Sequence, residues 1–128
     1  MTDGIADTSI FIAAESGRTL DLARLPDRLG VSIITIGELR AGVLAASTPD
    51  LVNGRMNTLA GALTLQPIPI DEAVAEAWAL LRVRLRDENL RMPVNDSWIA
   101  ATAMSRGIPV VTQDDDYVRV TGLDVIRV

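Results

Sequence analysis

The chain contains neither cysteine nor histidine among its 128 residues. Without cysteine it has no disulfide framework, no thiolate metal site and no cysteine nucleophile. Without histidine it can form neither a Ser-His-Asp triad nor a histidine-based zinc site, and it lacks the most common general base. Any hydrolytic chemistry would therefore depend on carboxylates, with or without a metal ion.

Long apolar runs are also missing, and no run reaches the roughly 20 residues that span a bilayer. The opening residues, MTDGIADTS, have neither the basic start nor the apolar centre of a signal peptide. Because 48% of the residues are hydrophobic, a sizeable core can form. We therefore expect a cytoplasmic protein with a single domain over residues 1–128.

Lysine is absent as well, so all 12 basic residues are arginine, and the net charge is −5. A negative net charge argues against nucleic acid as a partner, because phosphate contacts usually need a basic surface. Arginine favours bidentate phosphate contacts, but genome composition explains its excess equally well. Arg82, Arg84 and Arg86 spread around one predicted helix, which favours a solvated face, although Arg82 and Arg86 share a side.

Short apolar runs alternate with longer segments of helical periodicity. Strands are predicted at 4–7, 31–34, 109–112 and 123–128, and a weaker extended run with two prolines at 65–70. Helices are predicted at 8–15, 20–29, 35–46, 50–63, 71–87 and 96–106. This alternation predicts an α/β fold in which a parallel sheet carries helices on both faces.

Four acidic residues fall at matching places in this pattern. Asp7 ends the first strand, Glu38 lies in the first turn of the helix after the second strand, Asp96 opens a later helix, and Asp114 follows the next strand. Ligands of open α/β sheets bind beyond the carboxyl ends of the strands, so these acids can meet in one crevice. Crowded carboxylates repel one another unless a cation lies among them. All-oxygen ligands favour Mg²⁺ or Mn²⁺, which can activate water and stabilise charge on a phosphate.

Each acid also has a local explanation. Asp7 can cap the helix that follows it, and Thr35-x-x-Glu38 matches a capping box. Asn95-Asp96-Ser97 is typical of a helix N-cap, and residues 113–116 are typical of a solvated turn. Taken singly, each acid is better explained as a cap or a turn. Taken together, at matching ends of a parallel sheet, they favour a shared site.

Two tryptophans and one arginine have side chains of a kind that can contact a nucleic acid. Trp78 and Trp98 lie on apolar helix faces, and we interpret them as core residues rather than as platforms for stacked bases. Arg40 follows Glu38 by two residues, which makes it a candidate for a phosphate contact.

Several segments carry a resemblance to a known family. They are Asp7-Thr8-Ser9, the run from Ser32 to Gly42 around Glu38-Leu39, the run from Asn95 to Ala103, and the run from Val111 to Tyr117 with Thr112-x-Asp114-x-Asp116. With the closing residues 121–126 they cover the chain, and in this order they resemble the PIN-domain family, in particular VapC-type toxins of bacterial toxin–antitoxin pairs.

The resemblance implies a PIN-like three-layer α/β/α fold whose central parallel sheet has about four or five strands. It implies that Asp7, Glu38, Asp96 and Asp114 are the catalytic, metal-binding acids. The residues that it implies in accessory roles are Thr8, Thr112 and Asp116. It further implies an endoribonuclease that uses Mg²⁺ or Mn²⁺, acts on RNA, forms a homodimer and binds a cognate VapB-type antitoxin.

Two alternatives come from other classes of protein. An aspartate-based phosphatase could use Asp7 as its nucleophile, but it needs a second aspartate two residues later, where this chain has Ser9. A PIN-like module could bind RNA or protein without catalysis, although such a module has no use for four mutually repelling acids. The sequence leaves the register of the first strand open, because Gly4-Ile5-Ala6 replaces the bulky run that is usual in the family.

Overall fold

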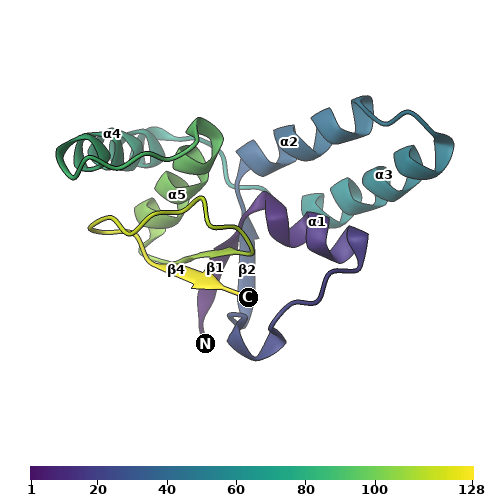
Figure 1. Ribbon diagram of the computed structural model, residues 1–128, viewed down its shortest axis with the longest axis horizontal. Helices are drawn as coiled ribbons and strands as arrows, with labels where there is room; N and C mark the ends of the chain where they lie inside the picture. Colours follow the sequence, from purple (N-terminus) through teal and green to yellow (C-terminus); the bar gives the residue numbers. More distant parts are fainter.

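The computed structural model describes residues 1–128, in which a four-stranded parallel sheet lies between layers of helices (Figure 1). The strands, in their spatial order, are β2 (Arg28–Val31), β1 (Asp3–Ala6), β3 (Val110–Thr112) and β4 (Val125–Arg127). Ile5 of β1 pairs with Gly30 on one side and with Val110 on the other, which settles the register of the first strand. The expected parallel α/β fold is confirmed.

Five α-helices surround the sheet: α1 (Thr8–Ser16), α2 (Ile33–Leu44), α3 (Pro49–Leu63), α4 (Glu72–Asp87) and α5 (Val94–Arg106). In Figure 1, α2 and α3 form a hairpin on one side of the molecule, and α4 lies on the other side against α5. None of the helices is both long enough and apolar enough to cross a membrane.

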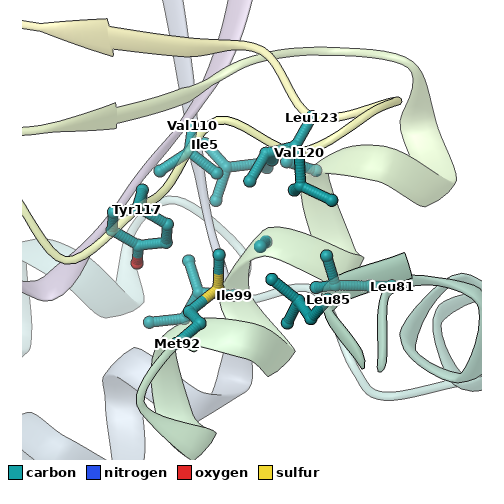
Figure 2. Packing of buried hydrophobic residues seen from close by; sticks show 11 residues of the cluster. Ile5, Leu81, Leu85, Met92, Ile99, Val110, Tyr117, Val120 and Leu123 are labelled. Carbon is teal, nitrogen blue, oxygen red and sulfur yellow. The ribbon is translucent and has the colours of Figure 1, made fainter. Parts of the chain in front are cut away.

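Alternation along the central strands divides the core between the two faces of the sheet. Ile5 and Val110 point toward α5 and α4, where they join a buried cluster with Leu81 and Ile99 (Figure 2). The next residues, Ala6 and Val111, point to the other face and pack with Ile10 of α1. A smaller cluster around Leu39 and Leu59 holds the α2–α3 hairpin together. The acids at the strand ends are therefore supported from both faces.

The second strand differs from its prediction at 31–34, because the helix that follows it begins earlier. Ser32 is the N-cap of α2, and its hydroxyl accepts a hydrogen bond from the Ile34 amide at 3.1 Å. The β-branched residues that suggested a strand therefore lie in the first turn of α2. Strand pairing moves back to Arg28–Val31, opposite Asp3–Ala6. The predicted helix 35–46 accordingly becomes Ile33–Leu44.

Three further boundaries also differ from the sequence prediction. The helix predicted at 20–29 is only a short 3₁₀ turn, Leu22–Arg24, because Pro26 and the start of β2 follow at once. The extended run at 65–70 makes a single bridge, between Ser32 and Ile68. The last strand is limited to Val125–Arg127.

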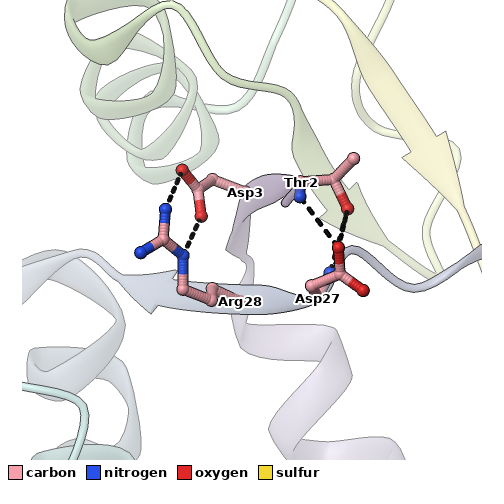
Figure 3. A network of polar contacts seen from close by, with 4 residues as sticks. All are labelled: Thr2, Asp3, Asp27 and Arg28. Carbon is pink, nitrogen blue, oxygen red and sulfur yellow. Dashed lines mark hydrogen bonds and ion pairs between the residues drawn. The ribbon is translucent and has the colours of Figure 1, made fainter.

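A polar clamp fixes the outer end of β1 against β2 (Figure 3). Arg28 donates two hydrogen bonds to the Asp3 carboxylate, at 2.6 and 3.0 Å. Asp27 accepts from the backbone amide and the hydroxyl of Thr2, and these hydrogen bonds lower the pKa of Asp27. Because the clamp is exposed, we expect it to define strand register more than to add stability.

Gly4 is required by the close packing around β1. A Cβ atom at this position would lie 2.8 Å from Val111 Cγ2 and 2.9 Å from Pro26 Cγ. Gly4→Ala should therefore lower the free energy of unfolding by about 1–3 kcal/mol, through overpacking at the sheet. Urea denaturation followed by circular dichroism measures this change.

Gly61→Ala is the matched control, because nothing lies within 4 Å of a Cβ at that exposed position in α3. Alanine inside a helix should raise the free energy of unfolding there by about 0.5–1 kcal/mol. A Gly4→Ala protein as stable as the unsubstituted chain would contradict the packing described for β1.

Candidate functional site

The carboxyl ends of the strands border one pocket of about 540 Å³. Asp7 follows β1, Asp114 follows β3, Glu38 lies in the second turn of α2, and Asp96 lies in the first turn of α5. All four line the pocket, together with two of the expected accessory residues, Thr8 and Asp116. The structure thus brings together acids from four separate parts of the sequence.

Asp7 is the most firmly held of these acids and is only 2% exposed. Its Oδ1 accepts hydrogen bonds from the Ser9 hydroxyl at 2.6 Å and the Ser9 amide at 3.1 Å, and its Oδ2 accepts from the Thr112 hydroxyl at 2.6 Å. Burial raises the pKa of Asp7, and the hydrogen bonds from Ser9 and Thr112 oppose that rise. Asp7 also caps α1, so the capping explanation and the site explanation hold together.

Ser9 is a supporting residue that the sequence analysis missed. Its hydroxyl donates to Asp7, accepts from the Gln113 amide at 2.9 Å, and lies 3.3 Å from Thr112 Oγ1. Thr112 Oγ1 in turn accepts from the Asp114 amide at 2.9 Å. The two hydroxyls therefore fix the start of α1 and the chain beyond β3 to the same carboxylate. The Asp-x-Ser spacing, which is typical of a side-chain turn, was the signal available for Ser9.

Thr8 connects Glu38 to the buried interior. The Thr8 hydroxyl donates to Glu38 Oε1 at 2.7 Å and lies 3.0 Å from Thr35 Oγ1. Since the single hydroxyl proton of Thr8 is directed to the carboxylate, Thr35 is the donor in the second contact. The expected capping box at Thr35 and Glu38 is wrong, because Ser32 caps α2. Glu38 is consequently free to face the pocket.

Asp96 carries the largest electrostatic strain among the acids. Burial raises its pKa to about 7, and the charges of its acidic neighbours contribute in the order Asp116, Asp7, Glu38 and Asp114. The N-cap expected at Asn95-Asp96-Ser97 is wrong, because α5 begins at Val94 and Pro93 occupies the cap position. The Asp96 carboxylate is thus not used for capping.

A buried hydroxyl faces the same acids. Tyr117 is 8% exposed, packs with Met92 and Ile99 in the core, and its hydroxyl has no hydrogen-bond partner (Figure 2). Burial raises the pKa of Tyr117, and the charges of Asp7, Asp96 and Glu38 raise it further. The hydroxyl therefore stays protonated and can donate to acidic oxygens or to water near them.

One cation, Arg18, lines the pocket beside the acids, and the sequence analysis did not identify it. Arg18 follows Gly17, the left-handed residue that ends α1, and so lies outside any helix or strand. Helical or strand spacing therefore could not predict that it lies near the acids. Arg40, the candidate from sequence, is exposed and is not among the lining residues. Asp115, between Asp114 and Asp116, instead forms an ion pair with Arg127.

The two tryptophans lie outside the pocket and join α4 to α5. The rings of Trp78 and Trp98 stack with their centroids 4.4 Å apart and an interplanar angle of 4°. Trp78 Nε1 donates to the Ser97 hydroxyl at 3.0 Å. Each ring covers a face of the other, but both side chains are only half-buried and belong to none of the hydrophobic clusters. Their interpretation as core residues is therefore wrong: the two rings pack against each other between α4 and α5.

The donor set suits a hydrated divalent cation. No three acids lie close enough together to bind one ion directly, but Mg²⁺ usually keeps several waters and takes only one or two carboxylates. The side chains that could bind such an ion are oxygen donors. The raised pKa of Asp96 and the unpartnered Tyr117 hydroxyl both mark a place where added positive charge and ordered water would be stabilising.

Comparisons with known proteins agree with this geometry. A family model described as PIN domain matches residues 5–123. Ribonuclease VapC5 of Mycobacterium tuberculosis is 47% identical over 128 residues, which span 98% of this chain and 95% of that protein. Ribonuclease VapC4 of the same organism is 50% identical over 129 residues, which span 97% of this chain and 95% of that protein.

Solved structures show the same fold. A crystal structure of a member of the VapBC family of toxin–antitoxin systems, VapBC-5 from Mycobacterium tuberculosis, includes a chain that matches with a TM-score of 0.91 and 42% identity, covering 100% of both chains. A DNA-bound VapBC from Salmonella typhimurium matches at a TM-score of 0.82 over 99% of this chain and 98% of that chain; at 22% identity it supports the fold alone. With its whole acidic pocket inside the matched fold, the chain belongs to the PIN-domain family.

Proposed function

We propose that this chain, acting as one PIN domain over residues 1–128, is a metal-dependent endoribonuclease and the toxin of a VapBC-type pair. The observation that carries the proposal is the pocket in which acids from β1, α2, α5 and the end of β3 face one another. The near-half identity to two proteins named as VapC ribonucleases supports the reaction class. The substrate is therefore RNA, and the bond cleaved is a phosphodiester.

Asp7, Glu38, Asp96 and Asp114 are the residues that would hold Mg²⁺ or Mn²⁺, one or two of them directly and the others through water bound to the ion. When bound, the ion supplies positive charge beside the phosphate and makes water more acidic. Asp7 stays in one orientation because Ser9 and Thr112 fix both of its oxygens, and Thr8 orients Glu38. Arg18 lines the same pocket and can contact a phosphate oxygen through its guanidinium group. Asp116 adds negative charge next to Asp96.

The catalytic alternatives find less support in the site. A phosphatase with Asp7 as its nucleophile would need a second aspartate two residues later, and that position is Ser9, whose hydroxyl donates to Asp7. A binding module without catalysis would gain nothing from a half-buried acid whose pKa is raised by burial and by its acidic neighbours. Neither alternative is favoured by any specific feature of the pocket.

The antitoxin is proposed to bind along α1, α2 and α3. A cleft of about 200 Å³ there is lined by Ile12, Leu39 and Arg55 together with Glu38, which also lines the acidic pocket. A short antitoxin tail could place apolar side chains on Ile12 and Leu39 and direct an arginine toward Glu38. Such a tail would cover the RNA path and compete with the metal ion at the same time.

A homodimer is also proposed, because α3 and α4 carry apolar side chains with no partner in the chain. Met56 and Leu63 of α3 are 53% and 40% exposed, and Leu80 and Val83 of α4 are 47% and 44% exposed. Apolar surface of this kind commonly marks an interface, and a twofold dimer would use the same faces of both copies.

Cleavage of RNA should require the acids and a divalent ion. Asp7→Asn and Asp96→Asn should each lower the rate of RNA cleavage at least about 100-fold, because each removes charge that binds the ion. Excess chelator should stop the unsubstituted enzyme, and Mg²⁺ or Mn²⁺ should restore it. A gel assay on single-stranded RNA measures the rate, with the exposed Asp50→Asn as a control expected to retain activity. Full cleavage in chelator would contradict the proposal.

The metal-free protein should lose stability as pH rises from about 4 to about 7. The folded-state pKa of Asp96 is about 7, above the roughly 3.9 of an unfolded chain. The folded state therefore binds more protons than the unfolded state in this window, so raising the pH favours unfolding. In EDTA, the melting temperature of the unsubstituted chain should fall between pH 5 and pH 8. The melting temperature of Asp96→Asn should fall by about 3 °C less over the same range.

Added Mg²⁺ provides the control for this pH effect. At pH 8 it should raise the melting temperature of the unsubstituted chain more than that of Asp96→Asn, because a cation relieves the same repulsion. Identical pH profiles for the two metal-free proteins would show that Asp96 is not electrostatically strained.

The toxin assignment is tested in cells. Expression of the chain alone should arrest growth, and co-expression of its cognate antitoxin should restore growth and yield a co-purifying complex. Asp7→Asn expressed alone should be harmless, which separates nuclease toxicity from a general burden of expression. Normal growth with the active chain alone would contradict the toxin role while leaving the nuclease activity open to separate assay.

A further inference from the structure

A second cleft, lined by three arginines, adjoins the acidic pocket. It has a volume of about 370 Å³, and its basic residues are Arg82 and Arg86 of α4 and Arg91 of the segment before α5. Val94, the first residue of α5, lines both this cleft and the acidic pocket. The two cavities therefore meet at the end of α5 that carries Asp96.

The arginines of this cleft are not neutralised by buried acids, and one of them, Arg82, lies against an aromatic ring. The guanidinium carbon of Arg82 lies 5.6 Å from the centroid of the Trp78 ring, and that ring is fixed to α5 through Trp98. Arg82 and Arg91 form no ion pair, and Arg86 pairs only with its neighbour Asp87, where the side chains are 75% and 62% exposed. An ion pair this exposed leaves most of the charge available to a ligand.

The neighbouring Arg84 shows the contrast. It lies on another flank of α4, and its guanidinium donates to the Thr121 carbonyl at 2.8 Å. The sequence spacing of Arg82, Arg84 and Arg86 suggested a solvated face around the helix. In the structure, Arg82 and Arg86 are exposed, as that prediction expects, and they also line one cleft with Arg91 beside the acidic pocket.

Positive charge also lies across the pocket, at Arg18. In Figure 1, the end of α1 that precedes Arg18 and the helix α4 lie on opposite sides of the strand ends. An elongated polyanion could thus cross the acids between two basic surfaces. A negative net charge therefore does not exclude a polyanion, because arginines line the acidic pocket and the cleft next to it.

We propose that a single RNA strand crosses the acidic pocket and that the cleft of Arg82, Arg86 and Arg91 binds its phosphates on one side of the bond that is cleaved. The inference rests on the proposed ribonuclease function and adds where the substrate backbone lies. Guanidinium groups match phosphate oxygens in a bidentate manner. Since the contacts go to phosphates, the cleft contributes affinity for RNA without selecting its sequence.

The test uses a fluorescein-labelled single-stranded RNA with the Asp7→Asn protein, so that binding is measured without cleavage. Adding Arg86→Gln or Arg91→Gln should weaken binding, measured by fluorescence anisotropy, by roughly threefold to tenfold. The slope of log Kd against log salt concentration should become shallower by about 0.7 for each lost phosphate contact. Arg106→Gln, an exposed arginine in the last turn of α5 that lines neither cavity, is the matched control and should leave both quantities unchanged.

Equal affinities for Arg86→Gln, Arg91→Gln and Arg106→Gln would overturn the inference. A second combined outcome would also overturn it. In that outcome, sedimentation shows that Arg86→Gln and Arg91→Gln dissociate a dimer, and the resulting monomer binds RNA as tightly as the unsubstituted monomer does. The cleft would then be an interface between copies of the chain. If the unsubstituted protein neither binds nor cleaves RNA, the proposed function fails and the inference fails with it. If the unsubstituted protein cleaves RNA while the arginine variants bind RNA as tightly as the control, only the inference fails.

Discussion

Mutual repulsion among carboxylates is the constraint on which the rest of this structure depends. The parallel sheet directs Asp7 and Asp114 to the same edge, and α2 and α5 add Glu38 and Asp96. Such an arrangement destabilises the folded chain unless it is compensated, because each acid raises the free energy of the others in their charged form. The neutral hydroxyls around Asp7 and Glu38 supply part of this compensation through hydrogen bonds.

The hydrogen bonds that compensate for this repulsion are shared unequally among the acids, and Asp7 and Asp96 differ most. Asp7 is buried and accepts three hydrogen bonds from Ser9 and Thr112, so its carboxylate is held in one orientation. Asp96 has no such donors, and its pKa is raised to about 7, first by burial and then by the charges of the acids around it. A cation would stabilise the charged form of Asp96 more than that of the other acids. Ion binding should therefore raise the free energy of unfolding through the same electrostatic interaction.

Much of this architecture could be predicted from the sequence. The alternation of strands and helices, and the positions of acids at strand ends, were enough to group Asp7, Glu38, Asp96 and Asp114, because parallel strands bring their carboxyl ends to one edge. The boundaries of β2 could not be predicted in the same way. The β-branched run after Val31 favours a strand locally, and only the cap formed by Ser32 and the pairing with β1 assign that run to α2.

The supporting residues of the site were harder to predict for a related reason. Ser9 acts through contacts with residues more than 100 positions away, Thr112 and Gln113, and Arg18 reaches the pocket from beyond the end of α1. Periodicity reports the faces of single helices and strands, so it does not report partners that only tertiary packing brings together. For the same reason, the sequence pattern did not predict that Arg82 and Arg86 line one cleft with Arg91.

The proposed ribonuclease chemistry depends on a divalent cation bound in the acidic pocket. Crystals of the chain soaked in Mn²⁺ test it most directly, through anomalous scattering at the manganese edge. We expect an anomalous peak from a bound manganese ion in the pocket, with carboxylate oxygens of Asp7 and Asp96 among the nearest atoms and water completing the coordination. Absence of a peak there at saturating Mn²⁺, with the pocket open to solvent in the crystal, would contradict it.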